Sequence, residues 1–352
     1  ENDKNTPVGS PTLTVSLADE KSFFGDSLAF TVEVADQGVD LSTLKVQLLY
    51  SEDVVAEELI RTKTYGTYAG KIYIPFLANI PNGTASLKFT LQNVSLTTST
   101  EVVPLPLERP DFPFLTLVTE EQSYRMDRKA LYQYGMEANL PSKVKAYIVA
   151  PAYGKNGNVV NFGWEDGKIT QGSTQMIPFS SLTAGSYVLS FNSMSYAATP
   201  FEAYTVNGED MQMLNDDQYT VDLSLDKEET LTILGIPGMD SWWLDSDYIV
   251  AENGAYKFQA AAGRYRITAD LNKKYLIFEA LNGNDLATLQ SDGSGAIWII
   301  GEGIGKPHLS SNEVGWTTEK ALCMAPIGDK KYQISLVAGD NIRANAINFK
   351  FF

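Results

Sequence analysis

Apolar and polar residues alternate along most of the chain, and this pattern predicts β-strands from one end to the other. Near the start, Leu13, Val15 and Leu17 alternate with polar residues, and similar runs recur as far as Leu91. Clusters of Asp, Gly and Asn interrupt the runs, which is typical of antiparallel sandwiches. We therefore expect an immunoglobulin-like β-sandwich over residues 12–107.

The segments on either side of this sandwich differ from it in composition. Residues 1–11 are polar, contain two prolines and a glycine, and predict a flexible tether. Four prolines fall within residues 104–113, and because proline stiffens the chain we expect a semi-rigid linker there. Residues 108–226 return to strand-like alternation, for example between Tyr187 and Phe191, and predict a second β-rich domain.

A pattern that occurs twice marks the C-terminal part, residues 227–352. Each copy is an apolar strand closed by glycine, then a polar loop that carries tryptophan, then a strand of the form Tyr-x-apolar. The first copy comprises residues 231–235, Trp242, Trp243 and residues 256–258; the second comprises residues 297–301, Trp316 and residues 332–334. The repetition predicts a C-terminal β-sandwich module with an internal duplication. The whole chain is thus expected to be all-β, with tandem β-sandwich domains.

Charge restricts the partners that such a chain can bind. Its 352 residues carry a net charge of −16, so nucleic acids and anionic membranes would repel it, whereas a neutral polysaccharide would not. Apolar residues make up 44% of the chain, which is enough for globular domains. No apolar run reaches the ~18 residues that a membrane-spanning helix requires.

Catalytic and metal-binding chemistry find little support in the composition. Cys323 and His308 are the only residues of their types, which excludes an internal disulfide and any His- or Cys-rich metal site. We expect no cofactor and no metal. Asp240, Asp245 and Asp247 lie near the first tryptophan loop, but no spacing singles out a catalytic pair. No catalytic residue is predicted, and a β-sandwich hydrolase remains an alternative.

The tryptophans supply the candidate binding residues. Trp298 lies within an apolar strand and is expected in the core, whereas Trp242, Trp243 and Trp316 lie among polar residues. Adjacent residues on a strand face opposite sides, so at most one of Trp242 and Trp243 should enter the core. Exposed indole rings favour stacking against sugar rings, whose hydroxyls need polar partners alongside. The predicted glycan-binding residues are Trp242, Trp243, Asp245, Trp316, Asn312 and Lys306, with His308 and Glu319 as further polar candidates.

At these positions the C-terminal third resembles the SusE/SusF-like outer-membrane lipoproteins of polysaccharide-utilisation systems. The resemblance rests on residues 297–301, the loop at Trp316, and residues 332–339 followed by residues 349–351. It implies a carbohydrate-binding-like C-terminal module in a non-catalytic lipoprotein at the cell surface, anchored by a lipid upstream of Glu1. It also implies capture of a polysaccharide or oligosaccharide, beside an outer-membrane transporter complex, through the loops at Trp316 and at Trp242 and Trp243.

The same aromatic residues allow another function. In a structural or adhesive surface protein they would contact a protein partner instead of a sugar. Calorimetry with soluble glycans separates the two hypotheses, because an adhesin of that kind should release no heat with any sugar.

Overall fold

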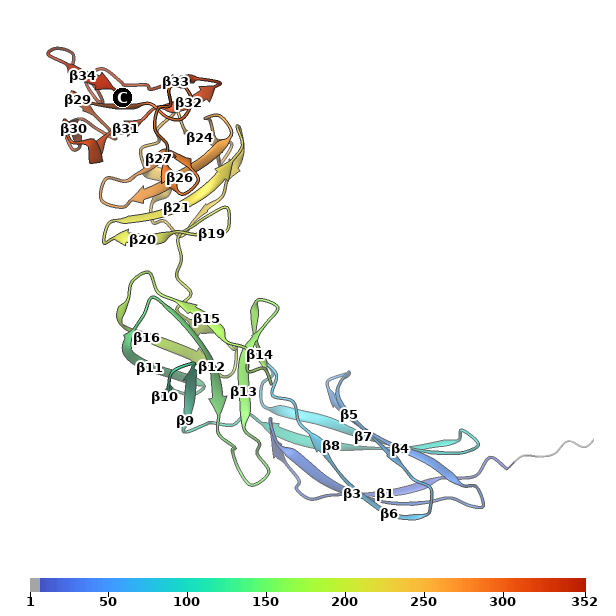
Figure 1. Ribbon diagram of the computed structural model, residues 1–352. Helices are drawn as coiled ribbons and strands as arrows, with labels where there is room; N and C mark the ends of the chain where they lie inside the picture. Colours follow the sequence, from blue (N-terminus) through green and yellow to red (C-terminus); the bar gives the residue numbers. More distant parts are fainter. Residues whose placement is uncertain (1–6) are drawn as a thin grey trace, which may run out of the picture. The chain divides into compact units, whose positions relative to one another are not determined.

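The computed structural model describes residues 7–352, and these form two compact units that divide after Phe201. Antiparallel strands dominate both units (Figure 1). The described residues contain no α-helix, only the short 3-10 helices η1 (Met239–Ser241) and η2 (Thr318–Lys320). No helix among them is long and apolar enough to cross a membrane. The predicted fold class, all-β with tandem β-sandwiches, is confirmed.

The first unit begins with a two-sheet sandwich of the predicted immunoglobulin-like kind. One sheet has the order β1-β3-β6 and the other the order β2-β8-β7-β4-β5. Alternate residues such as Phe30 and Phe89 point into the core, where their rings meet edge to face at 5.5 Å. The strands are β1 (Thr12–Leu17), β2 (Ser22–Phe23), β3 (Ser27–Ala35), β4 (Leu41–Tyr50), β5 (Asp53–Arg61), β6 (Gly66–Tyr73), β7 (Gly83–Asn93) and β8 (Thr98–Glu108).

The predicted tether, residues 1–11, lies partly outside the described residues. Within the described part, residues 7–11 are held against the sandwich, so the prediction is wrong there. Asn93 donates to the carbonyl of Val8 at 2.8 Å, and the Ser10 amide donates to Asp36 at 2.7 Å. Polar side chains of the sandwich thus satisfy the backbone of a segment that has no strand partner.

A nine-stranded sheet completes the first unit. Its order is β14-β13-β12-β9-β10-β11-β16-β17, with β15 paired to β12. The strands are β9 (Phe114–Thr119), β10 (Ser123–Ala130), β11 (Gln133–Leu140), β12 (Lys143–Ala150), β13 (Val160–Glu165), β14 (Lys168–Gln171), β15 (Ile177–Ser180), β16 (Gly185–Asn192) and β17 (Ala198–Thr199). Trp164 pairs across the β13–β14 hairpin with Ile169, and its ring stacks on that of Phe201 with the ring centres 5.8 Å apart.

The proline-rich stretch 104–113 is not a linker between separate domains. Its first part continues β8, and its second part enters a core that both halves of the unit share. Arg109 is buried and donates to the carbonyls of Leu77 (2.7 Å), Ile80 (2.8 Å) and Ser193 (2.7 Å). An arginine with several donors can satisfy backbone from both halves at once, which the proline content did not indicate.

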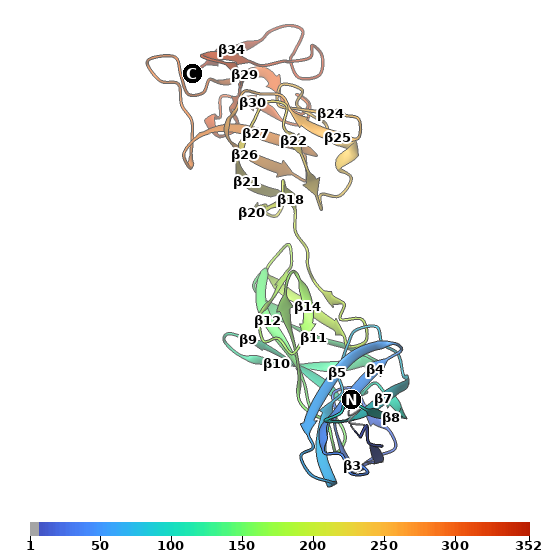
Figure 2. The same cartoon turned by 90° about the vertical axis from the view of Figure 1, so that its right-hand side faces the viewer.

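The second unit contains the remaining strands (Figures 1 and 2). Its largest sheet has the order β20-β21-β26-β27-β28, and β29 pairs with β30, β31 and β34. The strands are β18 (Thr205–Val206), β19 (Glu209–Asp210), β20 (Gln212–Asn215), β21 (Gln218–Leu225), β22 (Thr230–Leu231), β23 (Ile233–Leu234), β24 (Ile249–Glu252), β25 (Ala255–Phe258), β26 (Gly263–Asp270), β27 (Tyr275–Asn282), β28 (Asp285–Leu286), β29 (Trp298–Gly305), β30 (Glu313–Gly315), β31 (Leu322–Cys323), β32 (Ala325–Gly328), β33 (Lys331–Gln333) and β34 (Asn348–Phe351).

The structure divides the chain after Phe201, and not between residues 226 and 227 as predicted. β21 pairs with β26 along its whole length, from Gln218 opposite Asp270 to Leu225 opposite Gly263. A domain boundary after residue 226 would cut this sheet. The alternation in residues 218–225 identified a strand correctly, but it carries no information about a partner that lies beyond residue 262.

The two copies of the tryptophan pattern do not fold alike. In the first copy the apolar strand is divided, with β22 paired to β25 and β23 paired to β18. In the second it becomes β29, which has strands on both edges and continues to Gly305. A Cβ on Gly301 would lie 2.2 Å from the Asn348 carbonyl oxygen, so glycine permits β34 to approach. The predicted duplication is therefore one of sequence pattern, without a common pairing.

Candidate functional site

Two of the predicted glycan-binding residues form a buried ion pair. Lys306 is 3% exposed and Asp245 is 8% exposed, and Lys306 Nζ lies 2.7 Å from Asp245 Oδ2 and 3.8 Å from Asp247 Oδ2. Burial alone would raise the pKa of Asp247, but hydrogen bonds from Gln333 and Ser335 and the charge of Lys306 hold that pKa below its ordinary value. These groups satisfy one another inside the protein, so they are not available to a sugar.

The adjacent tryptophans divide between the interior and the surface. Trp242 is 7% exposed, whereas Trp243 is half-buried, with its ring centre 6.0 Å from Lys306 Nζ. The Trp243 ring also meets the His308 ring edge to face at 6.4 Å. Asn312 donates to the Lys306 carbonyl at 2.7 Å. Trp243, Asp245, Asn312 and Lys306 are therefore close together, although only Trp243 offers part of an aromatic face.

Trp316 is the most exposed tryptophan. It is 46% exposed and follows β30, two residues before η2 begins. The described residues show no ring contact between Trp316 and Trp243. The six predicted residues thus do not make one continuous platform.

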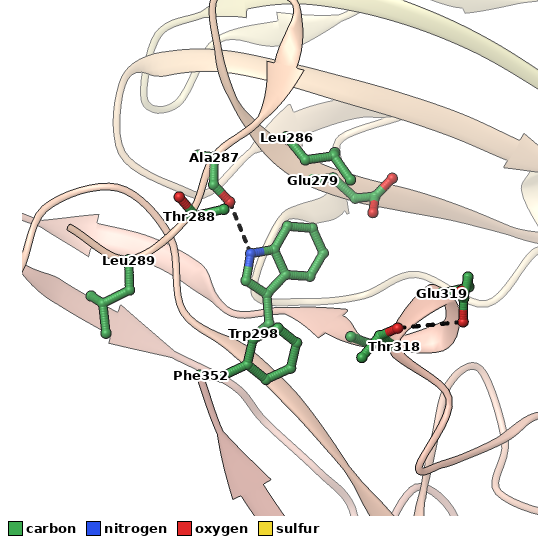
Figure 3. A pocket seen from close by; sticks show the side chains of 10 residues that line it. Glu279, Leu286, Ala287, Thr288, Leu289, Trp298, Thr318, Glu319 and Phe352 are labelled. Carbon is green, nitrogen blue, oxygen red and sulfur yellow. Dashed lines mark hydrogen bonds between the residues drawn. The ribbon is translucent and has the colours of Figure 1, made fainter.

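A cavity of about 380 Å³ lies around Trp298, and Thr318 and Glu319 of η2 are among its lining residues (Figure 3). The backbones of Trp298 and Phe352 exchange hydrogen bonds of 2.9 and 3.0 Å. Directly opposed residues of an antiparallel pair point to the same face, so both rings lie along the cavity. The Trp298 indole is held by a 2.9 Å hydrogen bond from its Nε1 to the Ala287 carbonyl. The other apolar lining residues are Leu286, Ala287, Leu289 and Ala321.

Polar side chains border the same cavity. Figure 3 shows Glu279 of β27 on one side of the indole and Thr318 with Glu319 on another, and Thr288 completes the polar lining. Burial raises the pKa of Glu279, although Arg266 opposite it on β26 acts in the other direction. Thr318 donates a long, 3.4 Å hydrogen bond to Glu319. The cavity therefore combines aromatic faces with hydrogen-bond acceptors and hydroxyls.

The sequence identified only part of this cavity. Glu319 was a polar candidate, but Trp298 was expected to be core, and it is indeed only 6% exposed. Phe352 and Glu279 were not singled out. No local signal could have found Phe352, because its partner Trp298 lies in a strand far away in sequence. Burial of one face of an indole does not stop its other atoms from lining a cavity.

The described residues contain no group of His, Cys, Asp and Glu side chains arranged to hold a metal ion. At this cavity the Phe352 ring, 45% exposed and backed by the buried Trp298, can stack against a flat apolar face, and the carboxylates can accept hydrogen bonds from hydroxyl groups. Its size falls in the range of small-molecule sites, which begins at about 300 Å³.

Three family models match the chain in succession. They are domains of unknown function: DUF5016 over residues 1–101, DUF5125 over residues 104–289 and DUF5121 over residues 292–352. No curated protein matches it. Among solved structures, the chain is similar to a DUF4466 family protein from Parabacteroides merdae, with 8% identity, a TM-score of 0.24, and coverage of 78% of this chain and 95% of that one. The DUF5125 model matches more than half of the residues, and the chain belongs to this family.

Proposed function

We propose that this chain is a non-catalytic glycan-binding protein whose C-terminal unit holds a saccharide in the Trp298 cavity. The observation that carries the proposal is the cross-strand pair of Trp298 and Phe352 in a cavity with carboxylates at its border. Aromatic rings pack against the CH faces of a sugar ring, and carboxylates such as Glu279 accept hydrogen bonds from its hydroxyls.

The segment of chain that borders the cavity also contains an exposed aromatic residue. Thr318 and Glu319 line the cavity, and the exposed Trp316 lies in the same segment of chain. A polymer seated in the cavity would have further sugar units for Trp316 to contact. Each contact is weak, because sugar hydroxyls exchange hydrogen bonds with water for hydrogen bonds with protein. Engagement of several units along one polymer would raise the apparent affinity.

The resemblance to SusE/SusF-like lipoproteins supports a location for this activity. We place the protein at the cell surface, as an outer-membrane lipoprotein with an anchor upstream of Glu1, where captured polysaccharide would pass to a transporter complex. The net charge of −16 is compatible with a neutral glycan as ligand. Protease digestion of intact cells tests this location, since an internal protein would survive the treatment.

Affinity electrophoresis in gels that contain soluble polysaccharides tests the proposed function. The wild-type chain should be retarded by at least one polysaccharide, and Phe352→Ala should weaken the interaction about threefold to tenfold, since full burial of a Phe side chain contributes about 1.5–3 kcal/mol and a ligand would cover only the exposed half of Phe352. Phe351→Ala is the matched control: Phe351 is 52% exposed, like Phe352 at 45%, but the alternation of the strand turns it to the opposite face. Equal retardation of wild type and Phe352→Ala would remove the cavity as the binding site.

A second measurement separates binding from hydrolysis. The polysaccharide that retards the chain is incubated with it, and the release of reducing ends is followed. The proposal expects no release above that of the polysaccharide alone. Sustained release that Glu279→Gln or Glu319→Gln abolishes would make the protein a hydrolase, because both carboxylates border the cavity.

One observation favours the adhesive alternative. Phe349 (43% exposed) and Phe351 lie on the other face of β34, with ring centres 5.5 Å apart. Exposed aromatic pairs of this kind are common at protein interfaces. If Phe351→Ala, and not Phe352→Ala, impairs the function of the protein in cells, the adhesive function is the better explanation.

A further inference from the structure

The charge of the Trp298 cavity carries information about its ligand. Its lining residues include two carboxylates, Glu279 and Glu319, and no lysine, arginine or histidine. The nearest arginine by strand register is Arg266, which lies directly opposite Glu279 on the neighbouring strand. Whether Arg266 can neutralise a bound anion depends on what already occupies its guanidinium group.

Arg266 is engaged outside the cavity through its Nε and Nη2 atoms. Its Nε and Nη2 donate to the two oxygens of Asp222 at 2.9 and 3.1 Å, and Nη2 also donates to the Asn284 carbonyl at 3.1 Å. Within residues 7–352, no group donates a hydrogen bond to the Glu279 carboxylate, while Glu319 receives only the long bond from Thr318. Both carboxylates therefore retain free acceptor capacity for a ligand.

We propose that the Trp298 cavity selects sugar units without acidic groups and rejects units that carry carboxylate or sulfate. This inference rests on the proposed glycan-binding function and specifies its ligand class. Hydroxyl groups of a neutral sugar donate to Glu279 and Glu319 while its CH face packs against Phe352, which lies beside the buried Trp298. A uronate or sulfate would place a second negative charge beside these carboxylates with no lysine, arginine or histidine of the lining to offset it, and such contacts disfavour binding strongly.

The lining of the cavity comes from stretches that two different family models match. Glu279, Leu286, Ala287, Thr288 and Leu289 fall in the stretch that the DUF5125 model matches, whereas Trp298, Glu319 and Phe352 fall in the DUF5121 stretch. The cavity exists only where both stretches fold together. The aromatic pair comes from one of them and the more buried carboxylate from the other.

The test compares chemically matched forms of one polysaccharide. The neutral polysaccharide that binds best is compared with its carboxymethylated form and with a hydroxyethylated form of the same degree of substitution. Hydroxyethyl groups have similar bulk without charge, so they control for steric effects. We expect the parent and hydroxyethylated forms to bind alike and the carboxymethylated form to bind at least about tenfold more weakly.

Paired variants separate the cavity from the net charge of the whole chain. The double variant Glu279→Gln/Glu319→Gln should reduce the tenfold difference in affinity between the hydroxyethylated and carboxymethylated forms to about threefold or less. The control Glu120→Gln/Glu121→Gln removes the same charge from an exposed turn in the first unit and should leave that difference in affinity unchanged. Equal binding of the charged and neutral forms by wild type would overturn the inference, and so would a difference that the cavity variant leaves unchanged. Failure of every glycan to bind would instead refute the proposed function itself.

Discussion

Replacement of Lys306 by methionine tests whether the buried charges near Trp243 are structural. Methionine has similar volume and no charge, so the change removes the ammonium group and leaves Asp245 and Asp247 in the interior. Asp247 keeps its hydrogen bonds from Gln333 and Ser335. Asp245 loses its strongest partner, the 2.7 Å contact with Lys306.

The expected loss of stability follows from distance and burial. Two unit charges 2.7 Å apart attract each other by about 6 kcal/mol at an effective dielectric constant of about 20. Part of this lost attraction is offset, because folding of the variant no longer removes an ammonium group from water. Removal of one partner from a buried ion pair costs about 3–5 kcal/mol in comparable proteins. We expect a loss in this range for Lys306→Met.

Urea unfolding at pH 7, followed by tryptophan fluorescence, measures the decrease in the free energy of unfolding of the second unit. Four of the five tryptophans lie there, so the signal reports mainly on that unit. Lys257→Met is the matched control, since Lys257 pairs with Glu252 at 3.2 Å but both side chains are exposed, and such pairs contribute about 0–1 kcal/mol. Equal losses in the two variants would refute the assignment of Lys306 to a structural role, and its place among the glycan-binding residues would have to be reconsidered.

Three further substitutions test other parts of the structure. Arg109→Met removes the donor to the buried Ser193 carbonyl and to the partly buried carbonyls of Leu77 and Ile80. It should cost the first unit about 3 kcal/mol by hydrogen exchange, whereas Arg128→Met, which breaks an exposed pair, should cost about 1 kcal/mol or less. Gly301→Ala should lower Tm by several degrees and weaken glycan binding because its Cβ would collide with β34, while Gly328→Ala has room for its Cβ. Glu279→Gln should raise Tm at pH 7. Burial raises the pKa of Glu279, so its charge opposes folding above that pKa. The gain in Tm should vanish below about pH 4, where Glu279 is protonated in both the folded and the unfolded protein. A gain that is the same at pH 4 and pH 7 would contradict this reasoning.

The sequence predicted the fold class because its signal is local. Alternation at Leu44, Val46 and Leu48 places three side chains on one face of a strand, and that face is buried in β4. Strand partners are not local, so the pairing of β21 with β26 and the burial of Arg109 were not predictable from the same pattern. The proline content of residues 104–113 indicated stiffness correctly but could not show that the segment continues into a shared core.

The candidate site was harder to predict because a polar residue beside a tryptophan indicates exposure only when no partner neutralises it. Asp245 and Lys306 are polar and lie near tryptophans, yet each neutralises the other, which allows both to be buried. Trp298 is surrounded in sequence by apolar residues, yet its ring borders a cavity because Phe352 lies opposite it. Charge pairing and cross-strand neighbours depend on three-dimensional contacts, and the sequence pattern around one residue contains neither.

The predicted residues and the observed cavity are nevertheless connected through β29. Trp298 is the first residue of this strand, and Lys306 follows its last residue, Gly305. The ion pair with Asp245 fixes the end of β29 to the loop that follows Trp242 and Trp243, while pairing with β34 at the other end places Phe352 opposite Trp298. The polar residues that the sequence assigned to ligand contact thus hold the strand on which the aromatic wall of the cavity is built. On this reasoning, Lys306→Met should bind glycan with unchanged affinity under conditions where the variant remains folded.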